Sequence, residues 1–182
     1  MRTAADMNKL ASGRPARMVR TLGTALAGAL VLLVAGCGGS AGLGSATTGG
    51  VPLTVSPSPD GNSYHNGQSI TVEVGPNRKF TPYLRVNILE CADPGGSSAN
   101  LPKSVADCDG NTIQGNTIVP KKDGSFTQPG YVIFKIPTSQ FGEPAGQTPI
   151  CDQSHACVLY IGENQEDFTQ PKIFSAPFMV TP

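Results

Sequence analysis

Five cysteines are the residues of this chain with the best-defined chemistry, and their positions separate one from the other four. Cys37 directly follows an uncharged segment, residues 21–36. The others lie in the C-terminal part of the chain: Cys91, Cys108, Cys151 and Cys157. A cysteine sulfur can be modified as a nucleophile, ligate a metal or form a disulfide. Which reaction applies depends on the neighbouring residues and on the compartment.

The segment before Cys37 has the make-up of a secretory signal peptide. Three arginines, at positions 14, 17 and 20, precede sixteen uncharged residues that end in Val34-Ala35-Gly36. A basic start, a short apolar core and small residues before the cut define such a peptide. The apolar run is shorter than the about 20 residues of a transmembrane helix. Residues 34–37 resemble the bacterial lipobox, in which the cysteine sulfur receives a diacylglycerol and the cysteine becomes the new N-terminus.

We therefore predict that residues 1–36 are removed and that Cys37 carries a lipid. This anchor would hold the protein on the extracytoplasmic face of the cell membrane. A secreted protein without lipid is the alternative, and Met7 and Met18 remain open as starts. Residues 37–51 are mostly Gly, Ser, Ala and Thr, which bury too little apolar surface to fold, so we expect a flexible tether.

The four remaining cysteines would reach an oxidising compartment, where an even number indicates disulfides. Four cysteines allow three pairings. We favour Cys91–Cys108 and Cys151–Cys157, because each pair is close in sequence and brackets a loop rich in Gly, Ser or Asp. A zinc site is the alternative, but paired zinc ligands are usually about two to four residues apart. Here the spacings are 17 and six residues, and His155 is the only histidine nearby.

Groups that could carry catalysis are sparse. His65 and His155 lie in polar segments, and the chain has no G-x-S-x-G elbow, phosphate-binding loop or H-E-x-x-H motif. Glu163, Glu166 and Asp167 form an acidic cluster that we interpret as a solvated loop, with a cation site as the alternative. We predict a protein that is not an enzyme and needs no cofactor. A Ser-His-Asp triad assembled in space is the competing hypothesis.

The elements that must position these residues are strands. The chain has 22 Gly, 16 Pro, no Trp and only 14% charged residues, a composition that favours short strands and turns. Apolar and polar residues alternate or form short apolar runs in seven segments: 53–55, 70–74, 84–88, 117–119, 132–136, 157–161 and 174–180. No helical period follows residue 50. We expect an all-β domain over residues 52–182.

The net charge of zero hides an asymmetry along the chain. Residues 1–36 hold five of the 13 basic residues and one of the 13 acidic residues, which leaves eight basic and twelve acidic residues in the remainder. Nucleic-acid binding depends mainly on cations that neutralise phosphates. We therefore expect no nucleic-acid partner, and we expect a monomer.

Short motifs accompany the strands in a fixed order: Leu53-Thr54-Val55-Ser56-Pro57, Glu90-Cys91-Ala92, Lys122-Asp123-Gly124-Ser125-Phe126, and Cys151-Asp152 followed by residues 156–161. In this order they resemble the neocarzinostatin family, secreted apoproteins with which actinobacteria carry enediyne antibiotics. The resemblance covers residues 52–182. It implies a seven-stranded immunoglobulin-like Greek-key sandwich, the same two local disulfides, and a cleft that binds an aromatic chromophore.

The chain also departs from that family. Asp93-Pro94 stand where the family has a large or aromatic side chain, and Gly162-Glu163 stand where it presents a serine to the cleft. Antibiotic carriers are released, whereas this chain has a lipobox. The resemblance therefore implies the fold more strongly than the ligand.

Turn aromatics indicate where a ligand would bind. Phe134, Phe174 and Phe178 fall on alternating positions and are expected in the core, whereas Phe126, Phe141 and Phe168 lie in turns. We predict a site at one end of the sandwich, framed by residues 91–108, 141–157 and 162–168. The candidate ligand-binding residues are Glu90, Asp93, Phe141, Gly162, Glu163 and Phe168.

We expect this cleft to bind an apolar or aromatic small molecule without catalysis. The charges of the candidate residues predict a more polar cleft than an enediyne carrier needs. The alternative is a protein-interaction or structural module of the envelope with no ligand pocket.

Overall fold

The structure, a computed structural model, describes residues 45–48, 50–93, 95, 100–114, 117–139 and 146–182. The expected signal peptide, Cys37, the first part of the tether and Phe141 lie outside the described residues. Strands dominate the described part, and its helical segments are short 3-10 turns such as η2 (Val105–Asp107) and η3 (Gly110–Thr112). The prediction of an all-β domain is confirmed. No helix among the described residues is long and apolar enough to cross a bilayer.

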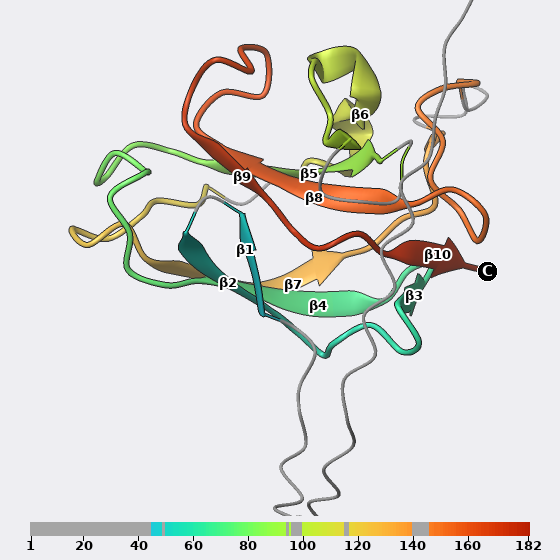
Figure 1. Ribbon diagram of the computed structural model, residues 1–182, viewed down its shortest axis with the longest axis horizontal. Coiled ribbons are helices and arrows are strands. Elements are labelled where there is room, and N and C mark those ends of the chain that lie inside the picture. The colour runs from blue at the N-terminus through green and yellow to red at the C-terminus, as the bar shows by residue number, and fades with distance from the viewer. Residues whose placement is uncertain (1–44, 49, 94, 96–99, 115–116, 140–145) are drawn as a thin grey trace, which may run out of the picture. The chain divides into compact units, whose positions relative to one another are not determined.

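Ten strands in the described part of the chain form three sheets (Figure 1). The first sheet is antiparallel, in the order β1 (Ser45–Thr48), β2 (Val51–Ser56), β4 (Ser69–Val74) and β7 (Phe126–Val132). The second is also antiparallel, in the order β6 (Cys108–Asp109), β5 (Asn87–Ala92), β8 (Cys157–Gly162) and β9 (Lys172–Phe174). The third is the parallel pair β3 (Ser63–His65) and β10 (Met179–Thr181).

The two four-stranded sheets are stacked, with the main core between them (Figure 1). Side chains on a strand alternate between its two faces. In β4, accordingly, Ile70, Val72 and Val74 are buried and Glu73 is exposed. Val72 shares one apolar cluster with Ile88 of β5, so residues of both sheets contribute to the core.

The expectation of a core position is confirmed for the three phenylalanines predicted there, the expectation of a turn is wrong for Phe126, and Phe141 lies outside the described residues. Phe174 and Phe178 are buried, and Phe134 packs against the core. Phe126, expected in a turn, is instead the first residue of β7 and is buried, with its ring centre 6.2 Å from that of Phe80. Pairing of Phe126 with Val74 extends the sheet past the turn, which moves this ring into the core.

The second sheet is covered on both faces, and all six residues of β8 are buried. A separate apolar cluster lies on the face away from the main core. It comprises Leu89, Cys91, Cys108, Val158, Tyr160 and Phe174, with Leu101, Ile113 and Phe168 packed against it. The segments before and after β8 in sequence therefore fold over the outer face of this sheet.

Three expected strand boundaries are wrong. The strand expected at 84–88 lies at 87–92, because Leu84 N–H donates to the Thr81 carbonyl and closes a turn. The strand expected at 132–136 lies at 126–132, and residues 117–119 contribute only a bridge from Ile118 to Val86. The sheet also continues into the segment expected as tether, since β1 pairs with β2.

Both predicted disulfides are present. Cys91 and Cys108 are direct partners in the β5–β6 ladder, and their sulfurs are bonded. Cys151 and Cys157 close the loop that precedes β8. Because all four sulfurs are bonded to one another, none can ligate zinc in this state. On the chain-entropy model the longer loop contributes about 3 kcal/mol and the shorter one less.

Candidate functional site

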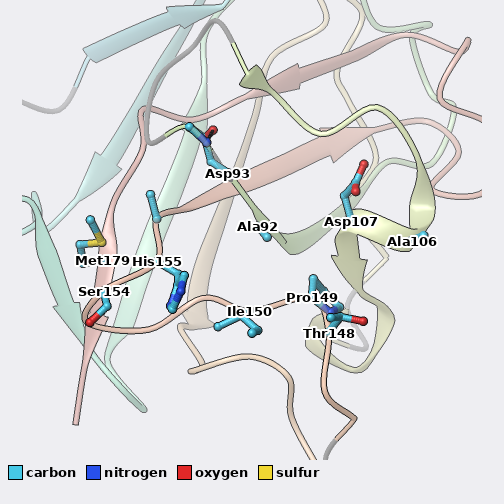
Figure 2. A pocket seen from close by; sticks show the side chains of 12 residues that line it. Ala92, Asp93, Ala106, Asp107, Thr148, Pro149, Ile150, Ser154, His155 and Met179 are labelled. Atoms are coloured by element: carbon cyan, nitrogen blue, oxygen red, sulfur yellow. Dashed lines mark hydrogen bonds between the residues drawn. The ribbon is translucent and has the colours of Figure 1, made fainter.

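A cleft of about 650 Å³ lies where β5 ends and β8 begins (Figure 2). Its walls are the end of β5, the η2 turn, residues 148–150, residues 154–156 and one side chain of β10. The lining residues are Ala92, Asp93, Gly95, Ala106, Asp107, Thr148, Pro149, Ile150, Ser154, His155, Ala156 and Met179.

Both disulfides border this cleft. Cys91 directly precedes Ala92, and Cys108 directly follows Asp107, so one bond ties two walls together. The other bond closes the loop that carries residues 154–156. The Asp93 N–H also donates to the Ala156 carbonyl at 2.8 Å, which links β5 to that loop. Walls fixed in this way lose little entropy when a ligand binds.

The surface of the cleft is mixed in character. Alanine, proline, isoleucine and methionine side chains supply the apolar part, and Ile150 is 38% exposed. The acidic part consists of Asp93, which is only 1% exposed, and Asp107. No lysine or arginine is among the described residues that line the cleft. The local charge therefore favours a neutral or cationic ligand over an anion.

The two acids are held by their own loops. Asp93 Oδ1 accepts a hydrogen bond from the Gly95 amide at 3.3 Å. Asp107 Oδ2 accepts the backbone N–H groups of Lys103 and Ser104 at 2.9 and 3.0 Å, which caps the η2 turn. Both acids thus have fixed positions before any ligand arrives.

His155 lines this cleft, and histidine is a residue type that often serves as a catalytic acid or base. Its Nδ1 lies 2.9 Å from Asp152 Oδ1, and its side chain is 57% exposed. The backbone N–H of Ser154 and the His155 ring lower the pKa of Asp152 by hydrogen bonding to its carboxylate. A hydrolytic triad needs a hydroxyl on the other ring nitrogen. In the described part of the chain, no hydroxyl hydrogen-bonds to the His155 ring. The observed pair stabilises the loop.

Asp93 is the candidate ligand-binding residue that the structure places in the cleft. Glu90 points instead into the interior, is fully buried, and its Oε1 accepts the Phe134 N–H at 2.8 Å. Burial raises the pKa of Glu90 well above its ordinary value, and the nearby Asp109 carboxylate raises it further. Phe141 lies outside the described residues.

Gly162, Glu163 and Phe168 lie at the other end of β8 from the cleft. A six-residue strand separates its ends by roughly 17 Å. Of the three segments expected to frame one site, residues 91–108 and 141–157 supply cleft residues, whereas 162–168 does not. A strand sends the loops at its two ends in opposite directions, so these segments could not all meet.

The three residues at that far end have structural contacts. A side chain at Gly162 would collide with the Tyr160 ring, whose hydroxyl donates to the Asn164 carbonyl at 2.6 Å. Phe168 stacks on Tyr160 with ring centres 4.9 Å apart, and the Lys172 ammonium lies 5.6 Å from the Phe168 ring centre. Glu163 Oε1 accepts the Thr81 N–H.

Several residues that line the cleft were not predicted from the sequence as ligand-binding residues. Ala106 and Asp107 adjoin Cys108, and Pro149 and Ile150 adjoin Cys151, so proximity to the cysteines is the signal that could have identified them. Met179 reaches the cleft from the C-terminal strand, and no local pattern indicates this.

Comparison with known proteins assigns no function to the cleft. No family model matches the chain, and no curated protein and no solved structure is significantly similar to it.

Proposed function

We propose that this protein is a non-catalytic binding module that holds a small, mostly apolar molecule outside the cell. The observation that carries this proposal is the cleft of about 650 Å³ bordered by both disulfides. Small-molecule sites are typically concave, roughly 300–1,000 Å³ in volume, and mostly apolar with a few fixed polar groups. The cleft has each of these properties.

The charge of the cleft narrows the ligand class. Asp93 and Asp107 are the acidic side chains among the described residues that line the cleft, and none of those residues is a lysine or an arginine. An anionic ligand would meet like charges, whereas an amine could pair with Asp107 at the rim. We propose a neutral or cationic aromatic compound as the ligand.

The proposal extends to the detailed arrangement of the strands and to the family that the domain resembles. We propose that the stacked sheets form a seven-stranded immunoglobulin-like Greek-key sandwich of the neocarzinostatin type, with β1, β3 and β6 as additions. Two observations support this: the local pairing of both disulfides and a cleft beside the short cysteine loop. The family's antibiotic-carrier role is not carried over, because the acidic cleft differs from the apolar one that the resemblance implies.

The proposed location rests on the lipobox. We propose that Cys37 is lipidated after removal of residues 1–36, which fixes the domain to the extracytoplasmic face of the membrane. Replacing Cys37 with Ser should abolish lipid labelling by a fatty-acid precursor. It should also lower the fraction of the protein that partitions into the detergent phase. Unlipidated wild-type protein found wholly in the culture supernatant would refute this location.

The ligand proposal is tested with two probes of the same shape and opposite charge. We expect 1-naphthylmethylamine to bind the full chain in isothermal titration calorimetry and 1-naphthoate to bind at least about tenfold more weakly. Ala106→Phe places a ring in the cleft and should weaken amine binding. Ala176→Phe is the matched control, because Ala176 is exposed and does not line the cleft.

Three results would reject the ligand proposal. Equal binding of both probes would show that the acids do not select charge. Failure of both probes to bind, or equal effects of the two phenylalanine variants, would favour the alternative of an interaction module without a ligand.

A further inference from the structure

We propose that the end of the domain opposite the cleft, formed by residues 77–85 and 117–124, docks on an anionic lipid bilayer. These residues are called the basic end below. This inference goes beyond the binding of a small molecule and does not depend on it, because the cleft lies at the other end of β8.

Hydrogen bonds join the two segments of the basic end into one surface. Asn77 N–H donates to the Asp123 carbonyl at 2.8 Å, and its side-chain amide donates to the Gly124 carbonyl at 2.8 Å. Tyr83 N–H donates to the Pro120 carbonyl at 3.0 Å. In Figure 1 both segments, green and yellow, project at the left-hand end of the sheets. The surface is therefore built from two fixed turns.

Positive charge is concentrated here. Five of the eight basic residues that follow residue 36 lie in these two segments, and all five are exposed: Arg78, Lys79, Arg85, Lys121 and Lys122. Among the described residues, none of the five forms an ion pair. The cations are thus available to an external anion.

One exposed acid, Asp123, lies within the basic end beside Lys121, and the other acids lie at its margin. Asp123 accepts hydrogen bonds from the Ser125 N–H and hydroxyl at 3.1 and 2.7 Å, within its own turn. Glu163 reaches the margin through the Thr81 N–H, and the acidic loop with Glu166 and Asp167 borders that side. The resulting surface has five cations against one central acid, with further acids along one edge.

Apolar side chains are exposed among these cations. Tyr83 is 70%, Leu84 47% and Val119 44% exposed, and together they are three of the five large apolar side chains exposed in the described part of the chain. Exposed apolar side chains gain nothing from a soluble polyanion, but they enter the headgroup region of a bilayer favourably. Tyrosine is typical of that region, since its ring is apolar and its hydroxyl polar. Cations plus exposed apolar groups therefore fit an anionic bilayer.

Tyr83 is the third residue of the Thr81–Leu84 turn, and this turn holds its backbone in a conformation that is unfavourable for a tyrosine. Its φ is +65°, in the left-handed region, which bulky side chains rarely adopt. The other described non-glycine residue with positive φ is an asparagine, Asn62, for which this conformation is ordinary. A strained tyrosine that is 70% exposed gains little from packing. Strain of this kind concentrates at functional sites.

The β1–β2 turn lies close to this surface, and Ser45 is three residues before Thr48, the last residue of β1 ahead of the turn. The β1–β2 turn is beside Gly75, whose N–H donates to the Pro52 carbonyl at 2.9 Å, two residues before Asn77. Cys37 precedes Ser45 by eight residues, a length that spans at most about 28 Å. A lipid on Cys37 and the basic end could therefore contact one bilayer.

The tyrosines provide a built-in reporter for the test. The chain has four tyrosines and no tryptophan, and Tyr64, Tyr131 and Tyr160 are buried, so Tyr83 is the exposed one. Full-length protein is mixed with vesicles whose acyl chains carry bromine, a contact quencher of fluorescence. We expect quenching by brominated phosphatidylglycerol vesicles, and at least about tenfold weaker binding to brominated phosphatidylcholine vesicles.

Matched variants separate the basic end from the rest of the chain. Lys121→Gln/Lys122→Gln should weaken binding to the anionic vesicles by roughly tenfold or more. Lys103→Gln/Lys135→Gln removes the same charge from exposed lysines elsewhere and should leave the quenching curve unchanged. The leader and any lipid are common to both variants, so a difference between them reports on the basic end.

A further variant tests Tyr83 without loss of folding. Tyr83→Asn should keep or raise the melting temperature, because asparagine tolerates positive φ, while vesicle binding measured by sedimentation falls. No quenching by anionic lipid, equal loss in both lysine pairs, or tighter binding to duplex DNA than to vesicles would overturn the proposal. A fall in melting temperature with unchanged vesicle binding would assign Tyr83 a structural role and also overturn it.

Discussion

Glu90 offers a sharp test of the electrostatics of this fold. Its side chain is fully buried, its Oε1 accepts the Phe134 N–H, and its Oε2 has no hydrogen-bond partner among the described residues. Burial favours the neutral carboxyl and raises its pKa well above 4.5, with Asp109 adding repulsion. Glu90→Gln retains the acceptor for Phe134 and removes the ionisable group.

The sign of the pH effect follows from linkage. Below about pH 4.5 the carboxyl is protonated in both states, and the full stability is present. Above that pH the unfolded chain loses this proton while the folded protein keeps it, so stability falls by about 1.4 kcal/mol per pH unit. The loss continues until pH reaches the raised folded pKa and then stops. The Gln variant lacks this loss.

Urea unfolding at several pH values between 4 and 8 measures the difference. We expect the free energy of unfolding of Glu90→Gln, relative to that of the wild type, to rise by about 1.4 kcal/mol for each pH unit over the first part of this range. Glu73→Gln, at an exposed position, controls for the change in net charge. If the stability difference between wild type and Glu90→Gln stays constant with pH, Glu90 is ionised in the folded protein and the reasoning fails.

Three further predictions concern packing and charge. Phe126→Ala should lower the free energy of unfolding by about 3–5 kcal/mol in urea denaturation, because it removes a buried ring that packs on Phe80; a loss below about 1 kcal/mol would contradict its place in the core. Gly162→Ala should lower the melting temperature, since the added methyl group meets the Tyr160 ring, and an unchanged value would show that the ring moves aside freely. The domain should not bind duplex DNA at physiological salt, given twelve acidic against eight basic residues after residue 36; micromolar, salt-sensitive binding in a gel-shift assay would show that the basic end overrides the total charge.

Local sequence determined the class of fold and the covalent frame. Alternation at residues 70–74 predicts which side chains are buried, because a strand has a period of two regardless of its partners. The cysteine pairs were predicted because the two members of each pair are close in sequence and bracket a loop rich in Gly, Ser or Asp. One residue of the candidate site, Asp93, was named from the resemblance to the neocarzinostatin family, and it lines the cleft.

Tertiary structure alone decided which segments meet. The loop at 162–168 was expected beside the cysteine loops, but six residues of β8 carry it to the opposite end of the sheet. Glu90, one residue before Cys91, faces the interior instead of the cleft because successive side chains on a strand point to opposite faces. Arg85 and Lys121 are far apart in sequence, and the bridge between Val86 and Ile118, together with backbone hydrogen bonds, brings their segments together. Burial and charge clustering depend on contacts between distant residues, which a local pattern does not contain.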